Sequence, residues 1–212
     1  MGRRKRRVDV TAGPTREHVD PVRYLSNESS GRMGFAIAAA AARAGCKVTL
    51  VAGPVSLATP DGVTRVDVVS ARDMLEAVRL AFDEADALFM SAAVSDWRPR
   101  RKLAGKWRKK DDGSRSASLE LVRNPDILAS VARQKGDRLV VGFALETGDG
   151  IRRAKAKMRR KGTDYVVLND ASALSGDRAS VTVLGVDGSV LELRDRTKDE
   201  IAEALVGLSH PA

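Results

Sequence analysis

Apolar, strand-like segments alternate with helix-like segments along most of this chain. VDVTAGPT, CKVTLVAGP, ALFMSAAV and RLVVGFAL each predict a strand, whereas residues 31–44, 71–84 and 150–161 have helical character. Strands that alternate with helices favour a parallel sheet covered by helices on both faces. We therefore expect an α/β protein with a Rossmann-like, doubly wound and mostly parallel sheet.

The remaining segments complete this expected architecture. TRVDVV, SLELV and DYVVLND predict further strands, and SVTVLGVDGSVLEL predicts a late β-hairpin around Asp187-Gly188, followed by a helix at 197–208. Asn124-Pro125-Asp126 predicts a helix start, with Asn124 as its cap. Residues 14–30 are polar and irregular, which predicts a long loop that is either functional or disordered. We expect residues 1–7 to be a basic tail or an expression remnant, and 8–209 one domain with 98–118 as a basic flap.

The single cysteine, Cys46, excludes an internal disulfide framework and a cysteine-based zinc site. A chain with so little cysteine is typical of a reducing compartment. No apolar run approaches the ~20 residues that a membrane-spanning helix needs. We therefore expect a cytoplasmic protein with no membrane partner.

The formal net charge of +9 is concentrated rather than spread. Basic residues gather at 3–7, 98–110 and 152–161, and the rest of the chain carries more acidic than basic residues. A nucleic-acid-binding module remains an alternative, although such modules usually carry their charge along a face. Local clusters are more typical of a site that holds a small polyanion, or of a solvated surface. We expect no nucleic-acid partner.

In a doubly wound sheet, ligands bind outside the carboxyl ends of the strands. The loop after the first strand carries Gly13, Gly31 and Gly34, a spacing that matches a dinucleotide fingerprint only loosely. The second strand ends in TLVAGP and lacks the acid that holds a ribose hydroxyl in such sites. A nicotinamide-dependent oxidoreductase is therefore an alternative with little support.

The stretch RYLSNESSGRMG places polar groups just before a helix of small residues. Glycine there lets the chain approach an anion at the helix N-terminus, whereas Ser29 or Ser30 as a simple helix cap is the structural alternative. Asn27 is either a turn residue or an amide that holds a carboxylate or acyl oxygen. Arg23 is either solvated or a bidentate donor to an anion.

Charged residues follow the later strands as well. Asp96 suits a sugar hydroxyl, a metal or a turn, and Lys106 lies in the flap. Lys157 and Lys161 are four residues apart and share a helix face, where like charges are costly unless an anion lies between them. No catalytic triad is evident, and His18 and His210 lack a nucleophile motif nearby. Positioning and charge stabilisation, as in phosphoryl and nucleotidyl transfer, is the expected strategy.

Several long motifs occur together and in order: TAGPTRE, DPVRYLSNESSGRMG, LVAGPVSL, AAVSDW, VRNPDIL, VGFALET and LND. On these motifs the chain resembles the phosphopantothenate–cysteine ligase family of coenzyme A biosynthesis over residues 8–208. The resemblance implies that 4'-phosphopantothenate reacts with CTP to an acyl-cytidylate and pyrophosphate, and that L-cysteine then gives the amide and CMP. It also implies Mg²⁺, a homodimer and, in bacteria, a common fusion to a flavin-dependent decarboxylase.

The resemblance also implies roles for individual residues. Asn27 matches the asparagine that holds the acyl intermediate, and Arg23 matches an arginine that supports the second half-reaction. The other matched positions would surround the substrates (Ser29, Ser30 and Gly31), the acid (Ala92 and Ala93) or the nucleotide (Gly13, Asp96, Pro125, Asp126, Ile127, Leu128, Phe143, Lys157 and Lys161).

The flap departs from the family pattern. The family has a Lys-x-Lys-Lys signature whose first lysine serves the activation step, and this chain has KWRKK, with Arg108 at the middle position. We assign the catalytic and nucleotide-binding lysine to Lys106. A register that uses Lys109 and Lys110 stays open, and the metal ligands are unknown.

Overall fold

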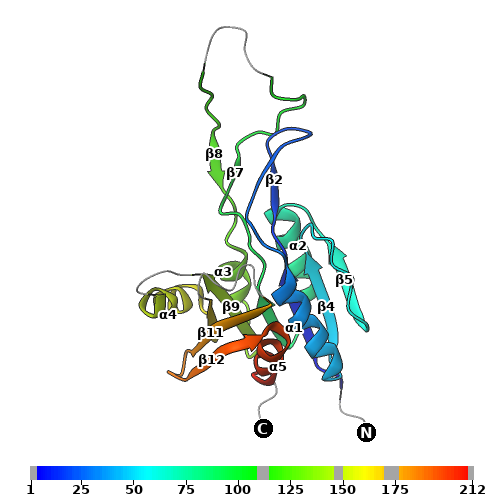
Figure 1. The fold of residues 1–212 in the computed structure, drawn as a ribbon, viewed down its shortest axis with the longest axis vertical. Coiled ribbons are helices and arrows are strands. Elements are labelled where there is room, and N and C mark those ends of the chain that lie inside the picture. The colour runs from blue at the N-terminus through cyan, green and yellow to red at the C-terminus, as the bar shows by residue number, and fades with distance from the viewer. Residues whose placement is uncertain (1–3, 109–114, 146–149, 170–176, 210–212) are drawn as a thin grey trace.

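The computed structural model describes residues 4–108, 115–145, 150–169 and 177–209. Its centre is an eight-stranded sheet in the order β12-β11-β10-β9-β6-β1-β4-β5 (Figure 1). Six neighbouring strands of this sheet are parallel to one another, namely β10, β9, β6, β1, β4 and β5, and β11 and β12 form an antiparallel hairpin at the edge. The strands are β1 (Arg7–Ala12), β4 (Lys47–Ala52), β5 (Val63–Asp67), β6 (Ala87–Met90), β9 (Leu139–Leu145), β10 (Tyr165–Asn169), β11 (Arg178–Gly185) and β12 (Val190–Thr197).

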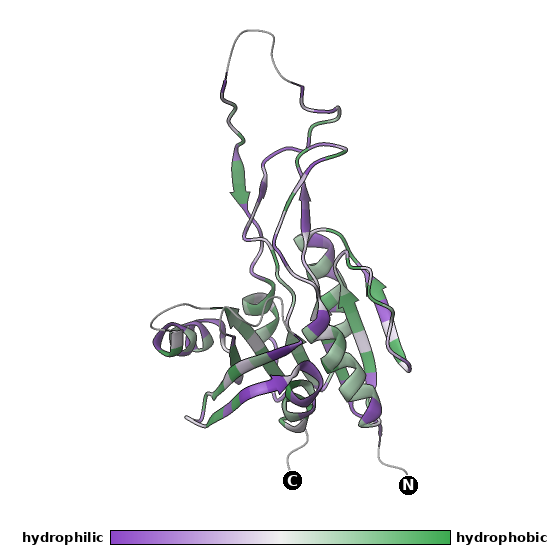
Figure 2. Ribbon diagram, in the orientation of Figure 1, coloured by the Kyte–Doolittle hydropathy of each residue, from purple (hydrophilic) through white to green (hydrophobic). Residues whose placement is uncertain are grey.

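Five helices cover the sheet within the described part of the chain: α1 (Arg32–Arg43), α2 (Ala71–Phe82), α3 (Ile127–Ala132), α4 (Gly150–Lys161) and α5 (Lys198–Gly207). Helices α1 and α5 pack with Val8, Val10 and Leu50 on one face. Helices α2, α3 and α4 pack on the other face. The central strands are mainly apolar, whereas α4 is largely hydrophilic on its outer side (Figure 2). The predicted α/β fold and late hairpin are confirmed.

A long arm extends beyond the sheet (Figure 1). It contains a hairpin of β2 (Arg16–His18) and β3 (Tyr24–Ser26) and a second antiparallel pair of β7 (Trp97–Pro99) and β8 (Leu121–Arg123). The prediction of an irregular loop at 14–30 is therefore wrong over these two strands. Buried Asp20 forms the turn, because its carboxylate accepts hydrogen bonds from the backbone amides of Val22 and Arg23 at 2.8 Å.

Two predicted helix caps are wrong, and both differences lie near the carboxyl edge of the sheet. The residue that precedes α1 is Gly31, at φ 76°, and no side chain caps this helix, so neither Ser29 nor Ser30 is its cap. Asp126 caps α3 in place of Asn124, and its carboxylate accepts the Ala129 amide at 3.0 Å.

The eight strands of the central sheet come from both the N-terminal and the C-terminal half of the described chain. The division into a tail at 1–7, a domain at 8–209 and a flap at 98–118 stays a prediction. Within the described residues, no helix has the length and apolar character that a membrane span requires.

Candidate functional site

Two cavities meet at the carboxyl ends of the central strands. The first has a volume of about 420 Å³ and the second about 550 Å³, within the range of small-molecule sites. The residues that line both cavities are Ala92, Val94, Asp96, Phe143 and Lys157. The two cavities are therefore adjacent, and ligands in both would border the same five residues.

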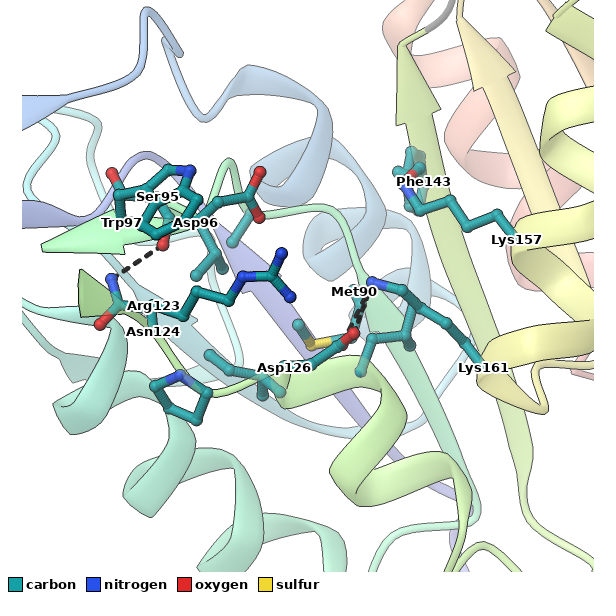
Figure 3. A pocket seen from close by; sticks show the side chains of 15 residues that line it. Met90, Ser95, Asp96, Trp97, Arg123, Asn124, Asp126, Phe143, Lys157 and Lys161 are labelled. Atoms are coloured by element: carbon teal, nitrogen blue, oxygen red, sulfur yellow. Dashed lines mark hydrogen bonds and ion pairs between the residues drawn. The ribbon is translucent and has the colours of Figure 1, made fainter. Parts of the chain in front are cut away.

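The lysines of α4 form one wall of the first cavity (Figure 3). The Lys157 Nζ donates to the Phe143 carbonyl oxygen at 2.9 Å, and the Lys161 Nζ lies 3.1 Å from the Asp126 carboxylate. Ala154 and Met158 bury one face of α4 in the core, and Lys157 and Lys161 lie on the flank of that face, where they border the cavity. The predicted shared face is confirmed, and Asp126 offsets part of the repulsion between the two charges.

The start of α3 forms the floor of this cavity. Burial alone would raise the pKa of Asp126, but the Ala129 amide and Lys161 stabilise its carboxylate and lower the pKa below its usual value. Ile127 and Leu128 are buried in the core and fix this helix start. Pro125 and these two residues line the cavity, as do all the predicted nucleotide-binding residues except Gly13 and Lys106.

The opposite wall follows β6 and β8. The Asn124 amide donates to the Ser95 carbonyl oxygen at 2.8 Å and thereby holds the two loops together. In Figure 3 the Arg123 guanidinium extends between Asp96 and Asp126. Sequence reasoning did not predict Arg123 or Trp97, although both line the cavity and the Arg123 guanidinium lies 5.5 Å from the centre of the Trp97 ring.

The second cavity lies over the N-terminus of α1. All six predicted substrate-binding residues line it: Asn27, Ser29, Ser30, Gly31, Ala92 and Ala93. The Asn27 amide donates to the Ala93 carbonyl oxygen at 3.1 Å, which joins the polar loop to the end of β6. The predicted grouping of the loop with this strand end is therefore confirmed, while the roles of the residues stay predictions.

Close backbone packing brings α1 to this position. A Cβ on Gly34 would lie 2.5 Å from the Ala12 Cβ and 2.8 Å from the Thr11 carbonyl oxygen, so only glycine lets the helix approach so closely. Gly13 lies under Gly31, whose Cβ would be 3.3 Å from the Gly13 Cα. Gly13 therefore packs behind Gly31 and lines neither cavity.

Two predicted catalytic residues, Arg23 and Lys106, line neither cavity. The Arg23 guanidinium binds Asp20 at 2.5 Å and donates to the Trp107 carbonyl oxygen in the flap. Burial alone would raise the pKa of Asp20, but amide hydrogen bonds, including one from Trp107 at 2.9 Å, and the Arg23 side chain lower it well below its usual range. Lys106 is exposed beside Trp107 on the arm. Lys109, Lys110 and His210 lie outside the described residues.

The described residues provide no group of three or more His, Cys, Asp or Glu side chains that could hold a metal ion. Mg²⁺ that arrives with a nucleotide needs only one or two protein carboxylates, since phosphates and water supply its other ligands. Asp96 lines both cavities and is compatible with that arrangement.

A doubly wound sheet with two adjacent cavities, both bordered by lysines, defines a Rossmann-like α/β protein with a cationic site at the carboxyl ends of its strands. The family described as the DNA/pantothenate metabolism flavoprotein C-terminal domain matches residues 3–209. The chain belongs to this family.

Relatives and a solved structure agree with that assignment. The coenzyme A biosynthesis bifunctional protein CoaBC of Vibrio cholerae is 44% identical over 97% of this chain and 52% of its own length. The protein of the same name from Escherichia coli is 49% identical over 78% of this chain and 41% of its own length. The crystal structure of the C-terminal domain of a CoaBC protein is 39% identical, with a TM-score of 0.82 over 96% of this chain and 93% of that one. The chain spans about half the length of the full-length relatives it matches.

Proposed function

We propose that the chain is a CTP-dependent ligase that joins 4'-phosphopantothenate to L-cysteine through an acyl-cytidylate. The observation that carries this proposal is that the two cavities adjoin, with Asp96, Phe143 and Lys157 on the border of both. Nucleotidyl transfer to an acid requires the two substrates to touch at one point. The relatives, named for coenzyme A biosynthesis, support this choice of reaction.

In the first step, a carboxylate oxygen of the acid attacks the α-phosphorus of CTP, and pyrophosphate leaves. Lys157 and Lys161 border the first cavity and would offset the negative charge of the triphosphate. Mg²⁺, with Asp96 as its proposed protein ligand, would supply further neutralisation of phosphate charge. We propose CTP, rather than ATP, as the nucleotide substrate.

In the second step, the cysteine amine attacks the acyl carbon. CMP leaves with the former carboxylate oxygen that linked the acyl carbon to the α-phosphorus. We propose that Asn27 holds the mixed anhydride through its amide during this step. Arg23 and Lys106 lie on the arm, so their proposed roles require that an arm reaches the cavities, from the same chain or from a second copy. The proposed homodimer would supply such a second arm.

The relatives are bifunctional proteins, which supports a partner activity on a second domain, and we propose a flavin-dependent decarboxylase. We propose the cytoplasm as the location, where CTP and cysteine are available.

Calorimetric titrations with CTP, NADPH and a short RNA, followed by a turnover assay, test this function against an oxidoreductase and a nucleic-acid-binding module. The protein should bind CTP in the presence of Mg²⁺, and should convert CTP, 4'-phosphopantothenate and cysteine to CMP, pyrophosphate and the amide. Binding of NADPH without CTP would favour an oxidoreductase. Binding of a short RNA with steep salt dependence, and no turnover, would favour a nucleic-acid-binding module.

A further inference from the structure

The second cavity has a cationic end that the sequence motifs did not indicate. Arg32, the first residue of α1, and Lys198, the first residue of α5, both line it. Both residues also line a neighbouring hollow of about 580 Å³. Neither residue lines the first cavity. These two side chains therefore mark the end of the second cavity that lies away from the first.

The local electrostatics favour an anion at this end. Arg32 forms an ion pair with Asp177 at 2.7 Å, but both side chains are at least half exposed, so solvent screens the pair. Burial and the nearby charge of Arg32 lower the pKa of Lys198, whereas Asp177 raises it. Asp177 and Asp199 line only the neighbouring hollow. Among the residues that line the second cavity but not the first, the cations Arg32 and Lys198 outnumber the one acid, Glu28.

The backbone adds to this positive potential. Helix α1 is 12 residues long, has no side-chain cap and has no acidic residue in its first turn. Its N-terminus lies in the same cavity as Arg32 and Lys198, with Ser29 and Ser30 beside it. Free amides at a helix N-terminus attract anions and here reinforce the two side chains.

The proposed acid substrate has two different anionic ends. Its carboxylate must lie at the wall that both cavities share, near Lys157, because only there can it reach a nucleotide. Its phosphate must then lie toward the other end of the second cavity. We propose that Lys198 and Arg32 bind the phosphate monoester of 4'-phosphopantothenate and select this acid over pantothenate. This inference rests on the proposed function and fixes the direction in which the acid binds.

A comparison of the two acids tests the inference. Lys198→Gln should raise the KM for 4'-phosphopantothenate by about 10- to 100-fold, the value of a charge-assisted hydrogen bond. The inhibition constant of pantothenate, which lacks the phosphate, should stay within about twofold, and the KM for CTP should not change. Lys198→Arg should recover much of the loss. Lys47→Gln, at an exposed position at the start of β4, is the matched control and should change neither acid.

If wild-type protein forms no product from the three substrates, the proposed function fails and this inference fails with it. If wild-type protein is active but Lys198→Gln weakens both acids equally, or neither, the ligase proposal stands and the phosphate assignment is wrong. The pantothenate inhibition constant also reports whether the variant cavity is correctly folded.

Discussion

The Lys161 ammonium lies 3.1 Å from the Asp126 carboxylate and joins the end of α4 to the start of α3 across the first cavity. Asp126 also caps α3, so a single carboxylate fixes both the helix start and the lysine. The Lys161 side chain is only 17% exposed, which limits its freedom before a ligand arrives. The cavity is thus organised for a polyanion by contacts within the protein.

Lys157→Gln should weaken CTP binding. Lys157 borders both cavities, and its loss removes a positive charge near the proposed site of nucleotidyl transfer. We expect the KM for CTP to rise about 10- to 100-fold in steady-state assays, with a smaller change for cysteine. Lys155→Gln, on the same helix but outside both cavities, is the control. An equal effect from both variants would show that only the general charge of α4 matters.

Asn27→Asp should separate the two half-reactions. The aspartate lacks the amide that donates to the Ala93 carbonyl oxygen and, in our proposal, holds the anhydride. Pyrophosphate release should persist, while amide formation falls by about 100-fold or more. Labelled acyl-cytidylate should then accumulate in quenched samples examined by mass spectrometry. Normal turnover of this variant would remove Asn27 from its proposed role.

Lys106→Gln should slow pyrophosphate release, because Lys106 is our assigned flap lysine for the activation step. We expect a decrease of about 10- to 1000-fold in single-turnover assays, typical of the loss of one charge-stabilising donor. Lys102→Gln, another exposed residue of the flap, is the matched control. An unchanged rate for Lys106→Gln would favour the register that uses Lys109 and Lys110.

Asp9→Asn should change how stability depends on pH. Burial in β1 raises the pKa of Asp9 from 3.8 to about 7, although Thr49 and Arg7 oppose this shift. The folded state therefore binds the Asp9 proton more tightly than the unfolded state, and its contribution to stability falls as pH rises from 3.8 to about 7. The variant should gain about 2–4 kcal/mol relative to wild type between pH 4 and pH 8 in urea unfolding.

Asp61→Asn, at an exposed turn, is the control for that experiment and should leave the pH dependence unchanged. Parallel stability profiles for wild type and Asp9→Asn would mean that Asp9 does not titrate in this interval.

Local patterns predicted most of the sheet and the helices that cover it. Residues 150–161 form a helix as predicted, because Ala154 and Met158 give it one apolar face for the core. The β2–β3 hairpin was missed because its strands have three residues each, and the buried turn residue Asp20 holds it together. Such a turn has no strong signal in a polar loop.

The site was only partly predictable for a related reason. The family motifs indicated the loop around Asn27 and the lysines of α4, which now lie around two joined cavities. Arg32, Arg123 and Lys198 were missed, because only the folded chain brings their elements to the cavities. Gly13 and Arg23 belong to family motifs but lie outside the two cavities, Gly13 against Gly31 and Arg23 on the arm beside Asp20.

The transfer of oxygen from the acid to CMP tests the central claim most directly. 4'-Phosphopantothenate labelled with oxygen-18 in its carboxylate is incubated with the protein, CTP, Mg²⁺ and cysteine, and the CMP is analysed by mass spectrometry. If the two substrates react where the two cavities adjoin, one labelled oxygen should appear in each CMP formed. CMP without the label, produced at the same rate as the amide, would contradict an acyl-cytidylate and with it this account of the site.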